Sequence, residues 1–208
     1  HLQGRKKMAL EYYFKALKLN EKAGNSKANI GRVLSNISNV YRDIGDLEKA
    51  QHYNKKAIVN HLEVNDLDGL SVCYFDEGAM CEDQNKYKEG LKKYLKALDY
   101  AIKIGDKAQI SSIYYNIVNV YLKIEDQETS PLVLDNAFLV EELELSENFL
   151  KVVQNYSLQE MLEKSIKYSI ESGDNYNLAY SYLVMGKLKH KQNKYNDGTL
   201  FLLKAYDV

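Results

Sequence analysis

The chain has 208 residues, of which 45% are hydrophobic and 27% are charged, which is the balance of a folded globular protein with one or two domains rather than a disordered one. Its 28 basic residues nearly match its 29 acidic ones, and the net charge of −1 argues against a global attraction to nucleic acid or to an anionic membrane. The single proline favours long, uninterrupted helices.

Helical patterns recur along the chain from its start. Residues 9–17 have the spacing of the second helix of a hairpin. First-helix patterns then occupy 34–41, 74–81 and 114–121, each ending on a residue 40 positions after the last, at Tyr41, Cys81 and Tyr121. Ala57 and Ala97, on the helices that follow, are also 40 residues apart. A fixed period of this length is typical of a stacked helical repeat.

A fourth copy lies near the end of the chain. The sequence Gln-Asn-Lys-Tyr at 84–87 returns at 192–195, Gly90 matches Gly198, and Ala97 matches Ala205. Small residues at Gly90 and Gly198, and at Ala50 in the earlier copy, let the two helices of a hairpin approach closely.

Turn residues separate the copies. Residues suited to a left-handed turn end the predicted helices at Gly24, Gly45, Asn65, Asn85, Gly105, Gly173 and Asn193. After the second helices, the next residue is an Asn or Asp that can cap the following helix, at Asn25, Asp66, Asp106 and Asp174.

The repeat resembles the tetratricopeptide (TPR) family over most of residues 5–124 and 157–207. The matching pattern in one copy is Tyr74, Gly78, Cys81, Tyr87, Gly90, Tyr94 and Ala97. The resemblance implies an all-α fold, a right-handed α-solenoid of antiparallel helix pairs with about 10 helices. Its 40-residue period, longer than the usual 34, is similar to that of TPR domains in bacterial regulators and some eukaryotic scaffolds.

One segment breaks the period. We expect a single superhelical domain over 1–208, with regular repeats at about 5–124, an irregular segment at about 125–156 and further repeats at 157–208. The irregular segment holds Pro131 and is compatible with a degenerate repeat, a binding loop or a gap where a mobile segment was removed. An acidic first helix is predicted at 139–153 and a second helix at 158–172.

The termini and the cysteines give further expectations. The chain starts at His1 without an initiator methionine and stops inside an apparent helix, so we expect a fragment of a longer protein. Cys73 and Cys81 would stand about 12 Å apart on one helix, too far for a disulfide, which predicts two free thiols. No apolar run approaches the roughly 20 residues of a membrane span, and no signal peptide is visible.

Motifs for catalysis, metals or cofactors are not found. The four histidines are scattered, and His52 and His61, nine positions apart, do not share a zinc-binding geometry. No glycine-rich phosphate loop, nucleophile elbow or Cys–His pairing occurs. We therefore expect no enzyme activity, no metal, no cofactor and no direct nucleic-acid binding by this chain.

Partner binding is expected on the concave face, which first helices line in the TPR family. The residues predicted to contact a peptide or protein segment are Arg32, Asn36, Asn39, Arg42, Phe75, Asp76, Tyr115, Asn116, Asn119 and Lys187. Further positions on the same face are Ser35, Ala79, Asp83, Lys123, Leu183 and Val184.

Asparagine pairs are the most suggestive part of this face. Asn36 with Asn39, and Asn116 with Asn119, are three residues apart on one helical face. An amide both donates and accepts hydrogen bonds, which suits recognition of a peptide backbone, although these amides can equally bond the protein's own backbone. The carboxylate clamp found in chaperone-type TPR domains is matched only in part, because the next first helix carries Phe75 and Asp76 instead of its basic residues.

The sequence therefore predicts a non-catalytic TPR domain that binds a protein or peptide, as the sensor or docking part of a bacterial regulatory protein acting in signalling or transcription regulation. The alternative is a structural scaffold or a self-association module, because open repeat ends leave apolar helix faces uncovered. A cytoplasmic location is predicted, with a periplasmic domain of a membrane-anchored regulator as the alternative.

Overall fold

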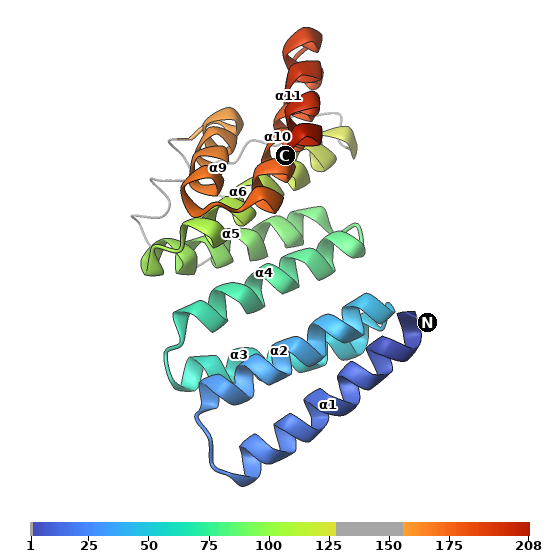
Figure 1. The fold of residues 1–208 in the computed structure, drawn as a ribbon, viewed down its shortest axis with the longest axis vertical. Coiled ribbons are helices and arrows are strands. Elements are labelled where there is room, and N and C mark those ends of the chain that lie inside the picture. Colours follow the sequence, from blue (N-terminus) through green and yellow to red (C-terminus); the bar gives the residue numbers. More distant parts are fainter. Residues whose placement is uncertain (1, 128–155) are drawn as a thin grey trace. The chain divides into compact units, whose positions relative to one another are not determined.

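Nine α-helices make up the part of the chain that the computed structural model describes, residues 2–127 and 156–208 (Figure 1). Successive helices form a TPR-like stack, as the repeat predicted. The predicted helix at 139–153 and the segment around Pro131 lie outside the described residues. The helices are α1 (Leu2–Lys22), α2 (Lys27–Ile44), α3 (Leu47–Glu63), α4 (Leu67–Asp83), α5 (Tyr87–Ile104), α6 (Lys107–Gln127), α9 (Leu158–Ser172), α10 (Asn175–Lys191) and α11 (Tyr195–Asp207).

Turns between the helices have the predicted left-handed residues. Asn65, Asn85 and Asn193 have φ angles of 51°, 58° and 60°. An asparagine tolerates this region because its short polar side chain bonds locally. The predicted turn positions are thereby confirmed.

Helix caps follow the prediction with one exception. The Asp66 carboxylate accepts from the Gly69 amide at 3.2 Å, and Asp174 accepts from the Asn177 amide at 2.9 Å. At the start of α2, however, the cap is the Ser26 hydroxyl, 3.4 Å from the Asn29 amide nitrogen, and not Asn25. The Asn25 side chain instead donates to Asn20.

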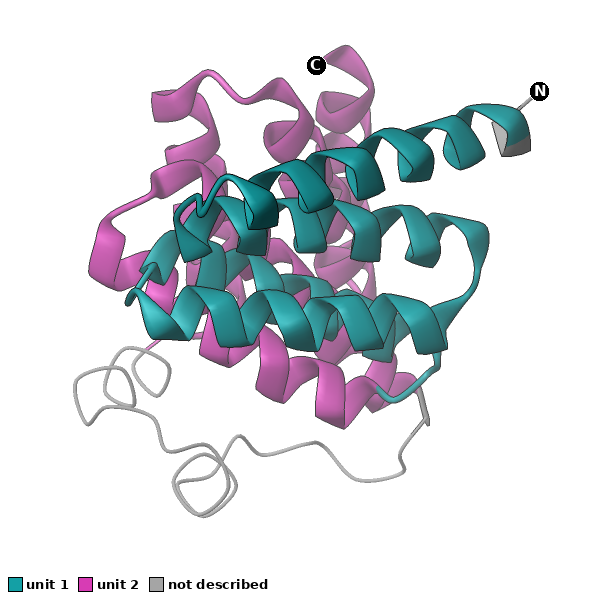
Figure 2. Cartoon of the chain, turned by 90° about the horizontal axis from the view of Figure 1, so that it is seen from below, with its two compact units in different colours: residues 1–86 teal, residues 87–208 magenta. Residues whose placement is uncertain are grey.

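The chain divides into two compact units, residues 1–86 and residues 87–208 (Figure 2). The first holds α1 to α4 and the second holds α5, α6 and α9 to α11. Whether the two behave as one superhelical domain stays a prediction.

In the first unit, α2 packs against α1 and α3, and α4 packs against α3 and α2. Leu34, Ala57 and Cys73 meet in its core. Polar groups inside are bonded to backbone: the Ser38 hydroxyl donates to the Ala50 carbonyl at 2.7 Å, and the Asn54 amide donates to the Cys73 carbonyl at 2.9 Å. Ala50 is fully buried, which agrees with the predicted close approach of paired helices.

In the second unit, α6 packs against α5, α9 and α10. The α9 helix has the predicted bounds, 158–172, and it lies directly on α6 although 30 residues separate them in the sequence. This pairing was not predicted, since the sequence suggested a first helix at 139–153 as its neighbour. The contact between α6 and α9 includes hydrogen-bonded hydroxyls, with the Ser111 Oγ 2.9 Å from the Ser165 Oγ and 2.6 Å from the Ser169 Oγ.

The cysteine prediction is confirmed, because Cys73 and Cys81 are both free thiols on α4. In the described residues, no helix combines the length and apolarity needed to cross a bilayer.

Candidate protein-binding surface

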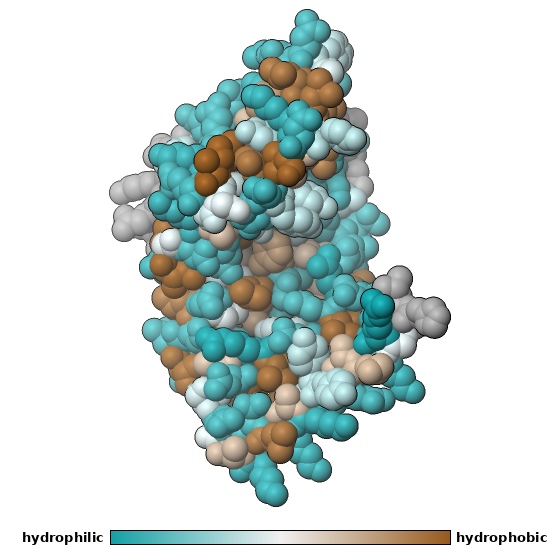
Figure 3. Space-filling model, viewed as in Figure 1, coloured by the Kyte–Doolittle hydropathy of each residue, from teal (hydrophilic) through white to brown (hydrophobic). Residues whose placement is uncertain are grey.

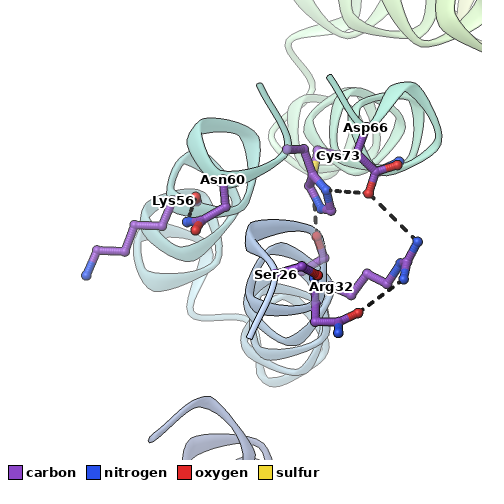
Figure 4. Close-up of polar contacts among 10 residues, drawn as sticks. Ser26, Arg32, Lys56, Asn60, Asp66 and Cys73 are labelled. Atoms are coloured by element: carbon purple, nitrogen blue, oxygen red, sulfur yellow. Dashed lines mark hydrogen bonds and ion pairs between the residues drawn. The ribbon is translucent and has the colours of Figure 1, made fainter. Parts of the chain in front are cut away.

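Arg32 and Asn36 are exposed on α2 in the first unit. The Arg32 guanidinium lies 3.4 Å from the Asn29 side-chain oxygen and 3.8 Å from the Asp66 carboxylate (Figure 4). Asp66 also contacts the His61 imidazole, with Nδ1 3.0 Å from its Oδ2. Arg32 is therefore held at the edge of α2 by neighbours on its own helix and at the start of α4.

His61 was not expected to matter, yet it is a central packing element of the first unit. Only 1% of it is exposed, and its ring fills the space between Gly31 on α2 and Gly69 on α4. A Cβ built on Gly31 would lie 2.6 Å from the ring, and one built on Gly69 would lie 2.1 Å from Nδ1. In the sequence, this packing of His61 was indicated only by Gly31 and Gly69, each near the start of a first helix.

Asp76, Asn39 and Arg42 come together between α2 and α4. Asp76 is only 6% exposed, and its Oδ2 is buried without a hydrogen-bond partner in the described residues. Burial raises the pKa of this carboxyl to about 7, although a hydrogen bond from Asn39 and the positive charge of Arg42 act in the opposite direction. Arg42 also pairs with Asp83, with Nε 2.6 Å from Oδ2.

Several residues that the sequence predicted as partner contacts in the first unit are thus less exposed to solvent than expected. Phe75 is half-buried, whereas Ser35, Asp76 and Ala79 are buried. The Ser35 hydroxyl lies 3.2 Å from the Cys73 sulfur. Asn36 and Arg32 are the predicted contact residues of this unit that are most open to solvent.

In the second unit, the predicted residues lie on α6 and α10. The Asn116 amide donates to the Ser112 carbonyl of its own helix at 2.8 Å, so that donor serves the local backbone. The Asn119 side-chain oxygen accepts from the Lys187 ammonium at 3.3 Å. Tyr115 is buried and stacks on Tyr180 with ring centroids 5.6 Å apart.

A pocket of about 440 Å³ opens at the C-terminal ends of α6 and α10. Three lysines and one carboxylate line it, together with an amide, an imidazole and two leucines. The lining residues are Asn119, Leu122, Lys123, Asp126, Lys187, His190, Lys191 and Leu202. The prediction named two of these as partner contacts, Asn119 and Lys187, and placed Lys123 on the same face.

Ion pairs fix one wall of this pocket. The Lys191 ammonium is 2.7 Å from Asp126 and 3.1 Å from Glu125. Burial lowers the pKa of Lys191, but the hydrogen bonds to Asp126 and Glu125 outweigh it, and the net pKa is raised. This lysine stays charged at neutral pH.

His190 forms the floor at the junction of α10 and α11. Its Nε2 is buried and has no hydrogen-bond partner in the described residues. A Cβ built on Gly198 would lie 1.9 Å from the His190 ring. The imidazole therefore occupies the space that a side chain at position 198 would need, and Gly198 is the glycine that was predicted for a close approach of paired helices. The ring of Tyr195 meets His190 edge-on, at 5.7 Å.

Sequence reasoning did not single out His190, Lys191, Tyr176 or Tyr180. The signal for the lysine was present, because Lys187 and Lys191 are four residues apart and share a helix face. Across residues 2–127 and 156–208, no three His, Cys, Asp or Glu side chains gather in a metal-binding arrangement.

Comparisons with known proteins agree with the repeat. No family model matches the chain. Over 93 residues it is 30% identical to photosystem I assembly protein Ycf3 of Rippkaea orientalis, a match that covers 44% of this chain and 51% of that protein. The chain thus spans about half the length of this curated relative.

A solved structure extends the similarity to the whole chain. BtubC (BKLC) from P. vanneervenii superposes with a TM-score of 0.71 over 99% of this chain and 73% of its own, at 14% sequence identity. A likeness at this identity concerns the fold. Together with the four in-phase sequence copies, it establishes the chain as a TPR-like helical repeat protein.

Proposed function

We propose that this chain is a non-catalytic protein-binding domain, which holds a peptide or protein segment against its first helices, α2 and α4 in one unit and α6 and α10 in the other. The observation that carries the proposal is the pocket between α6 and α10. Its 440 Å³ falls within the range of about 300–1,000 Å³ that is typical of ligand sites.

Chemistry of the pocket supports a protein ligand. Leucine side chains offer apolar contact, while Asn119 and the lysines offer hydrogen bonds and charge. Interfaces combine such an apolar centre with a polar rim. In the first unit, Asn36 and Arg32 present an amide and a guanidinium to solvent on a first helix.

A crosslinking experiment tests the proposal. A photoreactive amino acid at Asn36 or at Lys187 should capture a partner protein from an extract of the source cells. The matched controls are exposed positions on second helices, Lys55 on α3 and Lys167 on α9. Equal capture at all four positions, or capture only at the two controls, would show that the first helices are not the binding surface.

The finer role that we propose is the docking or sensor part of a bacterial regulatory protein. It rests on the 40-residue period, which is similar to that of TPR domains in such regulators. The full-length gene tests it: an attached DNA-binding or kinase module is the expected result. A gene that encodes only further helical repeats would contradict the regulatory role and leave protein binding in place.

Self-association is a second candidate, favoured by the surface of α11. Leu200, Leu203 and Tyr206 are 52%, 57% and 89% exposed on this helix, and apolar residues (brown) show over it at the top of Figure 3. The molar mass measured by light scattering should then rise with concentration, and Leu203→Glu should abolish the rise. A mass that stays at one chain over the whole concentration range would eliminate this candidate.

A further inference from the structure

Tyrosines form one end of the α6 and α10 surface. Tyr115 stacks on Tyr180 at 5.6 Å, and Tyr180 meets Tyr176 at 4.7 Å. Tyr176 is 66% exposed and Tyr180 is 40% exposed, so the stack presents aromatic area to solvent. Tyrosine is enriched in protein interfaces, where its ring gives a large contact area at a low entropic cost.

Positive charge dominates the other end. The pocket is lined by Lys123, Lys187 and Lys191 but by only one carboxylate, that of Asp126. Lys187 is exposed, and its ammonium makes a long contact of 3.3 Å with Asn119. An anionic group near Lys187 would gain a stronger, charge-assisted hydrogen bond.

The two ends share one face of the helices. On α6, Tyr115 and Lys123 are eight residues apart, and on α10, Tyr180 and Lys187 are seven apart. These spacings are close to two helical turns, so each pair returns to the same side, with a rise of about 10–12 Å. From Tyr176, eleven residues before Lys187, the rise is about 17 Å. An extended segment therefore covers the distance from the tyrosines to Lys187 in about three to five residues.

We propose that this surface binds an internal segment of a partner protein, with an aspartate or glutamate side chain in the lysine pocket and an aromatic or proline ring on Tyr176 and Tyr180. In an extended segment, the ring and the acidic residue are about three to five positions apart. The inference rests on the proposed function and adds the chemistry of the partner to it.

Charge complementarity selects an acidic partner residue over a basic or neutral one. Lys191 is already paired with Asp126 and Glu125, so a bound carboxylate would be attracted mainly by the exposed ammonium of Lys187, where a basic side chain would be repelled.

The test uses the whole chain and a phage library of random 12-residue peptides, each fused at its C-terminus to the coat protein, so that no peptide has a free terminal carboxylate. The selected sequences should share an acidic residue about three to five positions from an aromatic residue or proline. Synthetic, amidated versions containing tryptophan can be titrated by fluorescence, because the chain itself has no tryptophan.

Substitutions at the lysine end and at the tyrosine end of this surface then test the contact proposed for each end. Lys187→Gln and Tyr176→Ala should each weaken binding of the selected peptides at least tenfold, and so should replacing the acidic peptide residue by its amide. The matched controls, Lys167→Gln on α9 and Tyr12→Ala on α1, alter exposed residues off this surface, with Tyr12 65% exposed against 66% for Tyr176, and should leave the affinity unchanged.

Three results would overturn the inference: no enriched peptide, enriched peptides without acidic residues, or peptides that bind Lys187→Gln as tightly as the wild type. Non-acidic peptides that still lose affinity on Asn36→Ala would leave the proposed function standing while this inference falls. Circular dichroism of each variant confirms that the helices are intact.

Discussion

Replacing Gly69 by alanine should destabilise the first unit, because the new methyl group would enter the space of the His61 ring. The added Cβ would lie 2.1 Å from Nδ1 and 2.2 Å from Cε1, well inside van der Waals contact. The ring cannot move outward freely, since only 1% of His61 is exposed and Nδ1 is held 3.0 Å from Asp66. Helix α4 or α3 must shift instead.

Two opposing contributions set the size of the effect. Alanine is better than glycine in a helix by about 0.5–1 kcal/mol. Forcing extra atoms into a packed core costs about 1–3 kcal/mol. With a Cβ less than 2.3 Å from two atoms of a buried ring, we place the steric cost at the upper end of that range, so the net loss of unfolding free energy is about 2 kcal/mol.

Urea unfolding followed by circular dichroism measures this loss. Gly4→Ala is the matched control, because both glycines are the third residue of their helix and nothing lies within 4 Å of a Cβ at Gly4. The control should be neutral or slightly stabilising. In a His61→Ala background, Gly69→Ala should lose most of its cost, with a coupling energy above about 1 kcal/mol. A Gly69→Ala protein as stable as the wild type, or a coupling near zero, would refute the reasoning.

Three more substitutions test the buried polar groups. Because burial raises the pKa of Asp76 from 3.8 to about 7, the folded state binds a proton that the unfolded state has lost, and the unfolding free energy should fall as pH rises through this range, by up to about 4 kcal/mol. Asp76→Asn should flatten that slope in urea midpoints taken between pH 4 and pH 7, and an unchanged slope would exclude this carboxyl as its source. Arg42→Gln should cost less than about 1 kcal/mol, as expected of a part-exposed ion pair, yet raise the Asp76 pKa further in an NMR titration; a lowered pKa would contradict the contact. Ser165→Val should destabilise the second unit by about 1–3 kcal/mol, since its hydroxyl lies 2.9 Å from that of Ser111 and 2.7 Å from that of Ser181 in a fully buried site; a neutral result by urea unfolding would show that this cluster is loosely packed.

Local signals in the sequence predicted much of the fold. The turn residues Asn65, Asn85 and Asn193 required a left-handed backbone, and this placed the helix ends to within a few residues. The small residues Ala50 and Gly198 marked where paired helices approach. Such information lies within one or two helical turns, so a single sequence contains it.

Contacts between distant segments could not be predicted in the same way. The packing of α9 on α6 joins residues more than 30 positions apart, and no periodic pattern connects them. Likewise, helical spacing placed Asp76 on the inner face but could not show that it is buried beside Asn39. The ion pairs of Lys191 with Glu125 and Asp126 also depend on how α10 lies against α6.

The central claim is that first helices bind the partner, and hydrogen–deuterium exchange of the complex tests it most directly. With the crosslinked partner or a selected peptide bound, backbone amides in the C-terminal halves of α6 and α10 should exchange more slowly, with the largest change around Asn119 and Lys187. Exchange on α9, which contributes no residue to the pocket, should stay as in the free chain. Protection confined to α9 or α11, with α6 and α10 unchanged, would contradict the account.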